Sequence, residues 1–399
     1  MDPLKILFIS NGKGEDSIAA TIIRALKKVG EEEEKPEIHV KALPLVGNGR
    51  GYENTEADIV ANWKELPSGG FGGQKISSLF KDISAGLLHI TQDQISVLHN
   101  EASTVQLVVC VGDLYPVFLA AFFSGKPVIH VATAISAYFH KYTFFERWFF
   151  KKFCRLVVTR DLVTAEFLRI RKVPAAYFGN AMMDDPVLNS KKIDYSFGDK
   201  RLLALVPSSR EDAYDNTVRM FKVVQQVGRK PSIAWVLSLA PNLILERMIT
   251  LLSPLGFEYT PEPKEHGYCG QFTKTGCEPV HVILGNFGDI LRSSTVVLGM
   301  TGTGNEQVAG LGKPVILLKG KGAHSTWQRM MQYRKLLGRS IHIAWGSNKK
   351  IANDIMAIVN DQKKLKTMGD EGQARMGAPG GAYSIARAIF AEAMLNYHA

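Results

Sequence analysis

The sequence has few cysteines and no long apolar run, and each scarcity excludes a class of protein. Its 399 residues contain only Cys110, Cys154, Cys269 and Cys277, without a C-x-x-C pair. That pattern excludes a disulfide framework and indicates a reducing compartment. No apolar run reaches the roughly 18–20 residues that span a bilayer, and the apolar stretch near the start is too short for a signal peptide. We therefore expect a cytoplasmic protein without a transmembrane segment.

Basic residues outnumber acidic ones, 48 to 38, which gives a formal net charge of +10. The hydrophobic fraction of 46% and the charged fraction of 22% are ordinary for a globular protein and exclude disorder over most of the chain. The excess positive charge calls for an anionic partner: nucleic acid, a lipid surface or a small substrate. Because no nucleic-acid-binding motif is present, we expect no nucleic acid partner.

Short β-branched runs alternate with helical patterns, and this alternation restarts once along the chain. The predicted strands are Lys5–Ser10, Ile38–Leu43, Leu107–Val111, Val128–Ala132, Arg201–Val206, Ile233–Ser238, Val280–Leu284, Val296–Gly299, Val315–Leu318 and Ile341–Ala344. Continuous apolar strands with helices between them predict parallel sheets covered on both faces. We expect an α/β protein with two doubly wound domains, residues 1–180 and 181–381, followed by a helix within residues 382–399.

Ligands of open α/β sheets bind at the carboxyl ends of the strands, so the residues there are candidates for chemistry. The first strand is followed by Gly12, Lys13, Gly14 and Asp16, which form neither G-x-G-x-x-G nor a P-loop. Asp16 either caps the next helix or contacts substrate. Asp113 follows a later strand, and it is either a general base or the cap of the next helix.

Three loops in the second half follow a strand and open a helix, where backbone N–H groups favour an anion. The third is the basic segment Lys319–Ser325, and the residues of the first two are Ser208, Ser209, Arg210, Thr301, Gly302, Thr303, Asn305, Glu306 and Gln307. Hydroxyl and guanidinium groups at such positions suit a diphosphate. The second domain is therefore predicted to hold a nucleotide.

One segment combines large aromatic rings with basic side chains. Its candidate membrane-contact residues are Lys141, Phe144, Phe145, Arg147, Trp148, Phe149, Lys151 and Lys152. Rings at headgroup depth and cations against anionic lipid suit a membrane interface. The alternative is a core helix with a basic rim. The glycine-rich Gly69–Gly73 and the amphipathic Ile76–Ile90 are candidates to shape an acceptor site.

Several of these segments make the chain similar to a known family. Phe178–Asp184, Leu203–Arg210 and Thr301–Thr303, with Gly312–Pro314 downstream, resemble the lipid A disaccharide synthase family of glycosyltransferases, and more closely the lipid-A-disaccharide-synthase-related proteins. The resemblance implies a GT-B fold, in which two Rossmann-like domains face a central cleft, with the acceptor in the first half and the nucleotide in the second. It also implies that the last helix crosses back to the first domain and that the protein attaches peripherally to a membrane.

Roles carry over from the family to single residues. The resemblance places the proposed catalytic aspartate at Asp113 and the later aspartate of the first loop at Asp16, whereas Gly12 replaces an acidic residue of the family. Asn180 falls in a matching segment and is expected at the cleft. The ribose-binding glutamate of related enzymes falls on Gln307, with Glu306 one place away. One residue turns a helical side chain by roughly 100°, so both remain candidates.

The expected activity is transfer of a sugar from a UDP-sugar to a lipid acceptor at an anionic membrane, without a metal or other cofactor. Two alternatives stay open. A nucleotide-sugar 2-epimerase would share the two-domain fold, and a regulator would bind a nucleotide sugar without turnover. The substitution at Gly12 and the glutamine at position 307 favour the regulator slightly. The oligomeric state is not predicted.

Overall fold

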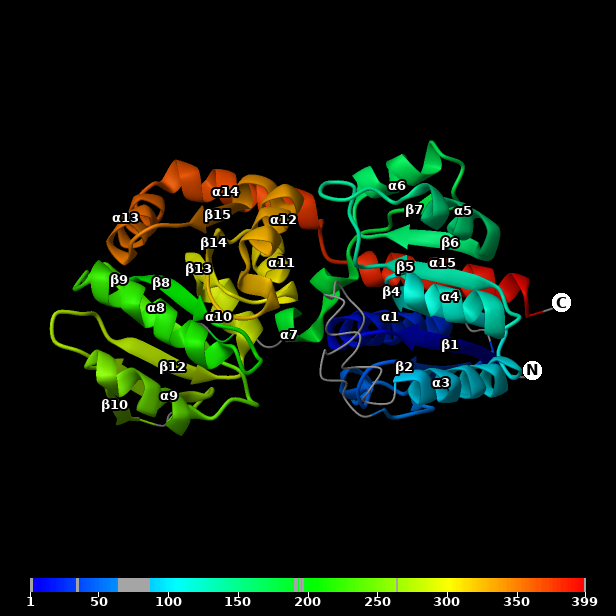
Figure 1. Ribbon diagram of the computed structural model, residues 1–399, viewed down its shortest axis with the longest axis horizontal. Coiled ribbons are helices and arrows are strands. Elements are labelled where there is room, and N and C mark those ends of the chain that lie inside the picture. Colours follow the sequence, from blue (N-terminus) through cyan, green and yellow to red (C-terminus); the bar gives the residue numbers. More distant parts are fainter. Residues whose placement is uncertain are drawn as a thin grey trace. The chain divides into compact units, whose positions relative to one another are not determined.

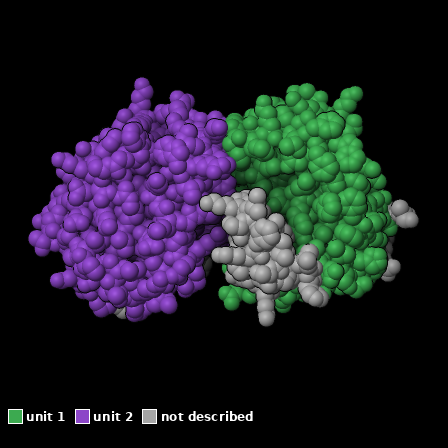
Figure 2. Space-filling model, in the orientation of Figure 1, with its two compact units in different colours: residues 1–185, 378–399 green, residues 186–377 purple. Residues whose placement is uncertain are grey.

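The computed structural model describes residues 3–33, 36–63, 87–189, 193, 195, 197–262 and 265–397. The chain divides into two compact units (Figure 2): unit 1 is residues 1–185 with 378–399, and unit 2 is residues 186–377. The boundaries expected at 180 and 381 therefore differ from the observed ones by five and four residues. The glycine-rich Gly69–Gly73 and most of Ile76–Ile90 lie outside the described residues.

Unit 1 is built on a parallel sheet with strand order β3-β2-β1-β4-β5-β6-β7 (Figure 1). Its strands are β1 (Leu4–Ser10), β2 (Ile38–Pro44), β3 (Asp58–Ile59), β4 (Leu107–Gly112), β5 (Val128–Ala132), β6 (Cys154–Thr159) and β7 (Ala175–Ala176). All residues of β1 except Lys5 are buried, as are all of β4 and β5. The predicted continuous apolar strands thus form the centre of the sheet, where both faces are covered.

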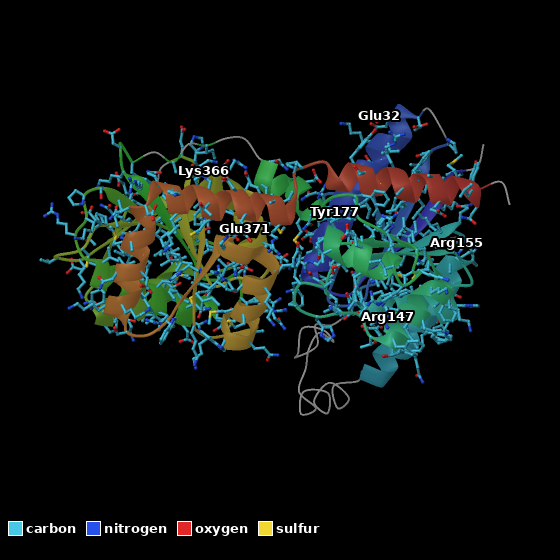
Figure 3. The ribbon with its side chains drawn as sticks, turned by 90° about the horizontal axis from the view of Figure 1, so that it is seen from above. Glu32, Arg147, Arg155, Tyr177, Lys366 and Glu371 are labelled. Atoms are coloured by element: carbon cyan, nitrogen blue, oxygen red, sulfur yellow. The ribbon has the colours of Figure 1, made fainter. Side chains whose placement is uncertain are left out.

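Helices of unit 1 connect these strands, and the last one closes the unit. They are α1 (Lys13–Glu32), α3 (Leu87–Ala102), α4 (Leu114–Phe123), α5 (Phe144–Phe153), α6 (Leu162–Arg169), α15 (Gly381–Leu395) and the short η1 (Arg50–Tyr52) and η2 (Ala181–Asp184). The chain returns from unit 2 to form α15, which packs on α1. Tyr383 of α15 donates a hydrogen bond to Glu32. Glu32, labelled in Figure 3, lies at the end of α1.

The start of α15 is fixed by a carboxylate and by a close backbone contact. Asp184 accepts hydrogen bonds from the backbone N–H groups of Gly380 (2.5 Å) and Ala382 (2.8 Å). A negative charge at this position also complements the helix dipole. A Cβ on Gly179, whose φ is +100°, would lie 2.8 Å from the Gly381 Cα, so only glycine permits this approach.

Unit 2 contains a sheet with strand order β10-β11-β12-β9-β8-β13-β14-β15. Its strands are β8 (Arg201–Val206), β9 (Ile233–Leu239), β10 (Glu258–Pro261), β11 (Tyr268–Thr273), β12 (Val280–Leu284), β13 (Val296–Gly299), β14 (Val315–Leu318) and β15 (Ile341–Ala344). The β10–β11 and β11–β12 pairs are antiparallel, and the other pairs are parallel.

Helices flank the sheet of unit 2. They are α7 (Pro186–Asn189), α8 (Ala213–Val227), α9 (Leu245–Leu252), α10 (Phe287–Ser293), α11 (Thr303–Gly310), α12 (Trp327–Leu337), α13 (Asn348–Val359), α14 (Gln362–Met376) and the short η3 (Ser253–Leu255), η4 (Ala323–Ser325) and η5 (Gly338–Ser340). Helix α8 packs on α13, and α11 packs on α14. In the part of the chain that is described, no helix is both long and apolar enough to cross a bilayer.

Candidate functional site

The strand order of unit 1 reverses between β1 and β4. The chain runs from β1 through α1 to β2 on one side, and from β4 through α4 to β5 on the other. Such a switch point is where open α/β sheets bind ligands, at the carboxyl ends of the strands. Asn11 directly follows β1 and Asp113 directly follows β4, so the fold brings both side chains to this point.

Asp113 accepts two hydrogen bonds at the same carboxylate oxygen. Asn11 Nδ2 donates to Oδ1 at 2.6 Å, and the backbone N–H of Tyr115 donates to it at 2.9 Å. The second bond makes Asp113 the N-cap of α4, so the capping role considered from the sequence is confirmed. Burial raises the pKa of Asp113, while the two hydrogen bonds oppose that shift. A carboxylate with a raised pKa is suited to accept a proton near neutral pH.

Glu15 is a second acidic side chain near this switch point, and the sequence argument overlooked it. Thr133, which follows β5, donates from its Oγ1 to Glu15 Oε1 at 3.5 Å. Arg160, which follows β6, donates to the Thr133 backbone carbonyl at 2.6 Å. Burial raises the pKa of Glu15, and the Asp113 charge adds to this rise while the Arg160 charge opposes it. The Asp113 charge is therefore one of the causes of the raised pKa of Glu15.

Asp16 lies in a different setting from Asp113. Its carboxylate accepts a hydrogen bond from Ser10 Oγ at 2.6 Å, and Ser10 is also 2.6 Å from the Tyr52 hydroxyl. Asp16 is only 2% exposed, and burial raises its pKa to about 7. Of the two roles considered for Asp16, the helix cap is wrong, because α1 begins at Lys13 and its N-cap is Gly12, and the contact with substrate stays a prediction. The buried carboxylate links β1, α1 and η1 instead of facing solvent.

The sheet of unit 2 has its own switch point, between β8 and β13. The chain leaves β8 toward β9 on one side and β13 toward β14 on the other. Ser208, Ser209 and Arg210 follow β8, and the segment Thr301–Thr303 follows β13, so the structure brings these predicted residues to one edge. Ser208 is buried at a φ of +127°, whereas Ser209, Arg210 and Thr303 are exposed. No side chain caps α11 at Gly302, which leaves its N-terminus suited to an anion.

The other three predicted residues of this site are largely buried inside α11. Asn305 is fully buried, and its Nδ2 donates to the Thr301 backbone carbonyl at 2.5 Å. It therefore holds the loop in shape, and its ligand contact stays a prediction. Glu306 and Gln307, the two ribose candidates, are 6% and 8% exposed.

Comparison with known proteins identifies the architecture. No protein-family model matches this sequence, and no curated protein matches it. Among solved structures, the UDP-GlcNAc 2-epimerase of Neisseria meningitidis bound to UDP-GlcNAc matches with a TM-score of 0.58 at 15% identity, over 98% of this chain and 100% of that one. The calicheamicin glycosyltransferase CalG4 matches with a TM-score of 0.61 at 13% identity, over 98% of both chains. Acinetobacter baumannii MurG matches with a TM-score of 0.57 at 13% identity, over 98% of this chain and 100% of that one.

The chain has the GT-B fold. Two Rossmann-like units make up this fold, as the sequence predicts, and the antiparallel strands β10 and β11 at one edge of the unit 2 sheet were not predicted. The identities are low, so the likeness covers architecture and does not extend to the lipid A disaccharide synthase family in particular.

His324 belongs to unit 2, where the sequence indicated it only as part of the basic segment Lys319–Ser325. A Cβ on Gly302 would lie 2.9 Å from His324 Cε1, so the imidazole packs directly on the start of α11. The Tyr333 hydroxyl lies 3.3 Å from its Nδ1. Burial, together with the charges of Arg210 and Arg329, lowers the pKa of His324 to about 4. The imidazole is therefore neutral at pH 7.

Asn216 joins two of the predicted loops and was also missed. It lies on α8, is fully buried, and donates from Nδ2 to the carbonyls of Pro207 (3.1 Å) and Lys321 (3.3 Å). Its Oδ1 accepts from the Lys321 backbone N–H at 2.9 Å. One amide thus fixes the loop after β8 against the loop after β14. An asparagine among the mainly apolar positions on one face of the predicted helix was the sequence signal that could have identified it.

The remaining predicted cleft residues are Gly12, Lys13 and Gly14 at the start of α1, and Asn180 at the start of η2. Gly12 is buried, Gly14 is half-buried and Lys13 is exposed. Asn180 is 7% exposed, and its Oδ1 accepts from the Met182 backbone N–H at 3.1 Å. Asn180 therefore caps η2, a structural role that the resemblance did not predict.

The aromatic–basic segment forms a helix only from Phe144 onward, with Thr143 and Glu146 making a capping box. Phe144, Phe145 and Trp148 are 78%, 55% and 46% exposed. Phe149 is 1% exposed, so its predicted membrane contact is wrong. It packs into the core of unit 1, because adjacent helical side chains point about 100° apart.

Helix α4 contributes two further exposed aromatic rings beside those of α5. Phe118 and Phe122 of α4 are 42% and 54% exposed, and both rings lie about 6 Å from the ring of Phe149. We call Phe118, Phe122, Phe144, Phe145 and Trp148 the aromatic face.

Basic side chains expected at a membrane lie on or beside α5. Lys141, Lys151 and Lys152 are exposed, and Lys152 Nζ lies 5.3 Å from the Trp148 ring centroid. Arg147, on α5 (Figure 3), donates to the Tyr142 carbonyl at 2.5 Å.

Proposed function

We propose that this protein is a glycosyltransferase that moves a sugar from a UDP-sugar to a lipid acceptor at an anionic membrane surface. The observation that carries the proposal is helix α4, which is capped by Asp113 and presents Phe118 and Phe122 to solvent. A helix rises about 1.5 Å per residue, so the backbone of Phe118 lies only about 7–8 Å from that of Asp113 along the helix axis. A lipid headgroup that rests on the aromatic face would therefore lie close to this carboxylate.

In the proposed reaction, Asp113 takes the proton from the attacking hydroxyl of the acceptor. Asn11 and the Tyr115 N–H both donate to Oδ1, and we assign the proton to Oδ2. The acceptor oxygen forms a bond to the anomeric carbon of the sugar while the bond from that carbon to the diphosphate oxygen breaks. UDP leaves with the bonding electron pair, and the proton remains on Asp113 until solvent removes it.

The departing diphosphate is assigned to unit 2. Arg210 and Ser209 are exposed beside the start of α11, where N–H groups favour negative charge. Fixed donors aimed at developing charge are usually the largest catalytic contribution. We propose transfer without a bound metal or other cofactor. The described residues contain no group of three or more His, Cys, Asp or Glu side chains that could hold a metal ion.

Peripheral attachment to the membrane completes this proposal. The aromatic face supplies rings for the headgroup region, and Lys141, Lys151 and Lys152 supply positive charge for anionic lipid.

The decisive experiment measures UDP release by the full chain from a panel of UDP-sugars, with anionic liposomes that contain a bacterial lipid extract. We expect UDP release that requires both the liposomes and one particular UDP-sugar, together with a glycosylated lipid detected by mass spectrometry. UDP-sugar binding by calorimetry without UDP release in any lipid mixture would contradict the proposal and favour the non-catalytic regulator.

A 2-epimerase is the second candidate, and the presence of two acidic side chains with raised pKa values, Glu15 and Asp113, favours it. Two carboxyl groups with raised pKa values can serve as acid and base on one substrate. The N. meningitidis structure similar to this chain is described as a UDP-GlcNAc 2-epimerase. Incubation with UDP-GlcNAc alone, followed by proton NMR, separates the two: an epimerase forms the C2 epimer without any lipid, whereas the proposed transferase leaves the sugar unchanged.

A further inference from the structure

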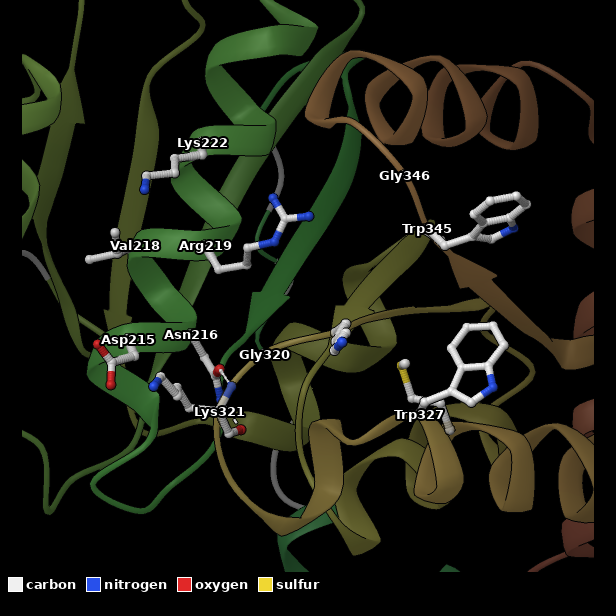
Figure 4. A pocket seen from close by; sticks show the side chains of 13 residues that line it. Asp215, Asn216, Val218, Arg219, Lys222, Gly320, Lys321, Trp327, Trp345 and Gly346 are labelled. Atoms are coloured by element: carbon white, nitrogen blue, oxygen red, sulfur yellow. Dashed lines mark hydrogen bonds between the residues drawn. The ribbon is translucent and has the colours of Figure 1, made fainter.

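A basic pocket of about 540 Å³ lies in unit 2 between α8, the loop after β14, α12 and the end of β15 (Figure 4). We propose that this pocket binds a phosphate ester that carries a ring, with the phosphoryl group on its cations and the ring against its two indoles. None of the proposed donor residues Ser208–Arg210 and Thr301–Thr303 lines the pocket. The pocket thus shares Lys319 and Lys321 with the basic loop predicted to help hold a nucleotide, but it does not include the residues to which we assign the departing diphosphate.

Four cationic side chains line this pocket. Arg219 and Lys222 come from α8, and Lys319 and Lys321 come from the loop after β14. They face a single lining carboxylate, Asp215, so four positive charges and one negative charge leave +3. None of the three lysines forms an ion pair with any of the described residues. An excess of positive charge around one pocket favours an anion with more than one charge.

Arg219 is the most sheltered of these cations. It is half-buried, burial lowers its pKa, and its guanidinium donates to the Asn348 side chain at the start of α13. That bond holds the group in place on the wall of the pocket. A guanidinium so fixed offers its remaining N–H donors to a phosphoryl group in a geometry that suits phosphate.

Two tryptophans supply the second half of the recognition. Trp327 and Trp345 are 51% and 63% exposed, although large apolar rings are usually buried. In Figure 4 both indoles lie on the side of the pocket opposite α8, and Arg219 extends from α8 toward that side. Lys350 Nζ lies 4.8 Å from the Trp345 ring centroid. Exposed flat rings beside cations suit a ligand that has its own ring next to its phosphate.

The volume fits a small molecule of this kind. Pockets for small ligands usually measure about 300–1,000 Å³, and they combine apolar walls with a few polar groups. Inorganic phosphate alone would use the cations and leave both indoles uncovered. A sugar phosphate and a nucleoside monophosphate would each place a phosphoryl group on the cations and a ring against the indoles. They therefore belong to the same proposed ligand class.

Calorimetric titration of the full chain with glucosamine 1-phosphate, uridine 5′-monophosphate and inorganic phosphate tests the proposal. We expect at least one of the two esters to bind about tenfold tighter than inorganic phosphate. Lys222→Glu should weaken that binding about tenfold or more, whereas Lys230→Glu, at an exposed lysine outside the pocket, should not change it. Trp345→Ala should reduce the advantage of the ester over inorganic phosphate.

Two results would overturn the proposal. Equal affinities of the wild type and Lys222→Glu would remove the pocket as the site. Binding that is lost in Arg210→Ala and kept in Lys222→Glu would assign the ester to the proposed donor loops. Thermal unfolding of each variant shows whether a loss reflects binding or folding.

Discussion

Asn11 and Asp113 are 102 positions apart in the sequence, yet Asn11 Nδ2 donates to Asp113 Oδ1 at 2.6 Å. This bond ties the loop after β1 to the first residue of α4. It depends on Gly112, whose φ is +141°, because a Cβ there would lie 2.0 Å from Asn11 Oδ1. The backbone at the end of β4 is thus shaped to bring the amide against the carboxylate, and the pKa of that carboxylate depends on the amide.

Replacing Asp113 by asparagine should separate its chemical role from its structural one. Asparagine is also a good N-cap, so α4 and the thermal stability should be retained. Turnover measured as UDP release should fall by about 10²–10⁴, since a positioned general base contributes roughly that factor. The KM for the UDP-sugar should change little. Full turnover by Asp113→Asn would exclude the proposed base.

Asn11→Ala should move the pH dependence of kcat/KM. The hydrogen bond from Asn11 favours the ionised carboxylate and lowers the pKa of Asp113, so its loss lets that pKa rise. The base must be deprotonated to act, and the acidic limb of the profile should therefore shift to higher pH. Ser10→Ala, which changes a bond to Asp16 and none to Asp113, should leave that limb in place. A shift to lower pH in Asn11→Ala would contradict the assignment.

Asp16 should make the stability of the protein fall as pH rises. Its pKa is about 7 in the folded chain against an ordinary 3.8, so the folded state keeps a proton that the unfolded state has lost between these values. The stabilisation is complete below about pH 4 and is lost as pH rises through 7, by at most about 1.4 kcal/mol per pH unit. Urea unfolding from pH 5 to 8 measures this change.

Asp16→Asn is the matched variant for that measurement. Its amide does not titrate, so the free energy of unfolding of the wild type relative to the variant should decline from pH 5 to pH 7 and then level off. Other titrating groups occur in both chains and cancel in the comparison. A difference that stays constant with pH would show that Asp16 is ionised in the folded chain throughout this range.

Most strands could be read from the sequence, including the edge strand β15, whereas β3, β6, β7, β10 and β11 could not. Val128–Ala132 and Val280–Leu284 are apolar runs, and the predicted bounds equal those of β5 and β12. Strand β6 follows α5 without a break, so no turn signal marks its start at Cys154. Strands β10 and β11 are antiparallel and partly exposed, and their mixed composition resembles that of loops.

The candidate site was predictable where it depends on strand ends and unpredictable where it depends on helical phase. Asp113 directly follows a strand, which is enough to place it at the ligand edge. Choosing between Glu15 and Asp16 requires the start of α1, which is Lys13 and not Asp16 as the sequence suggested. The same phase problem placed Phe149 on the membrane side, although its side chain points into the core. The contact between Asn216 and Lys321 spans 105 positions, beyond the reach of local patterns.

Asn216→Ala should weaken both the fold and the binding of UDP. The substitution removes hydrogen bonds to Pro207 and Lys321 and leaves buried backbone groups unpaired, which should lower the free energy of unfolding by about 1–3 kcal/mol. The loops after β8 and β14 would lose their common anchor, and calorimetry should show UDP binding about tenfold weaker. Thr217→Val removes a buried bond within α8 and should reduce stability without affecting UDP. Unchanged UDP affinity in Asn216→Ala would contradict the anchoring role.

Substitutions of exposed and buried aromatic residues on α5 should have different effects. The first should reduce membrane binding, and the second should reduce the free energy of unfolding. Serine at Phe144, Phe145 and Trp148 removes three exposed rings, so sedimentation with anionic liposomes should fall severalfold while the midpoint of urea unfolding changes little. Phe149→Ala removes a buried ring and should lower the free energy of unfolding by about 3–5 kcal/mol. Because the folded fraction of Phe149→Ala keeps its exposed rings, that fraction should still sediment with liposomes. Wild-type sedimentation by the triple variant would show that Phe144, Phe145 and Trp148 do not contact the membrane.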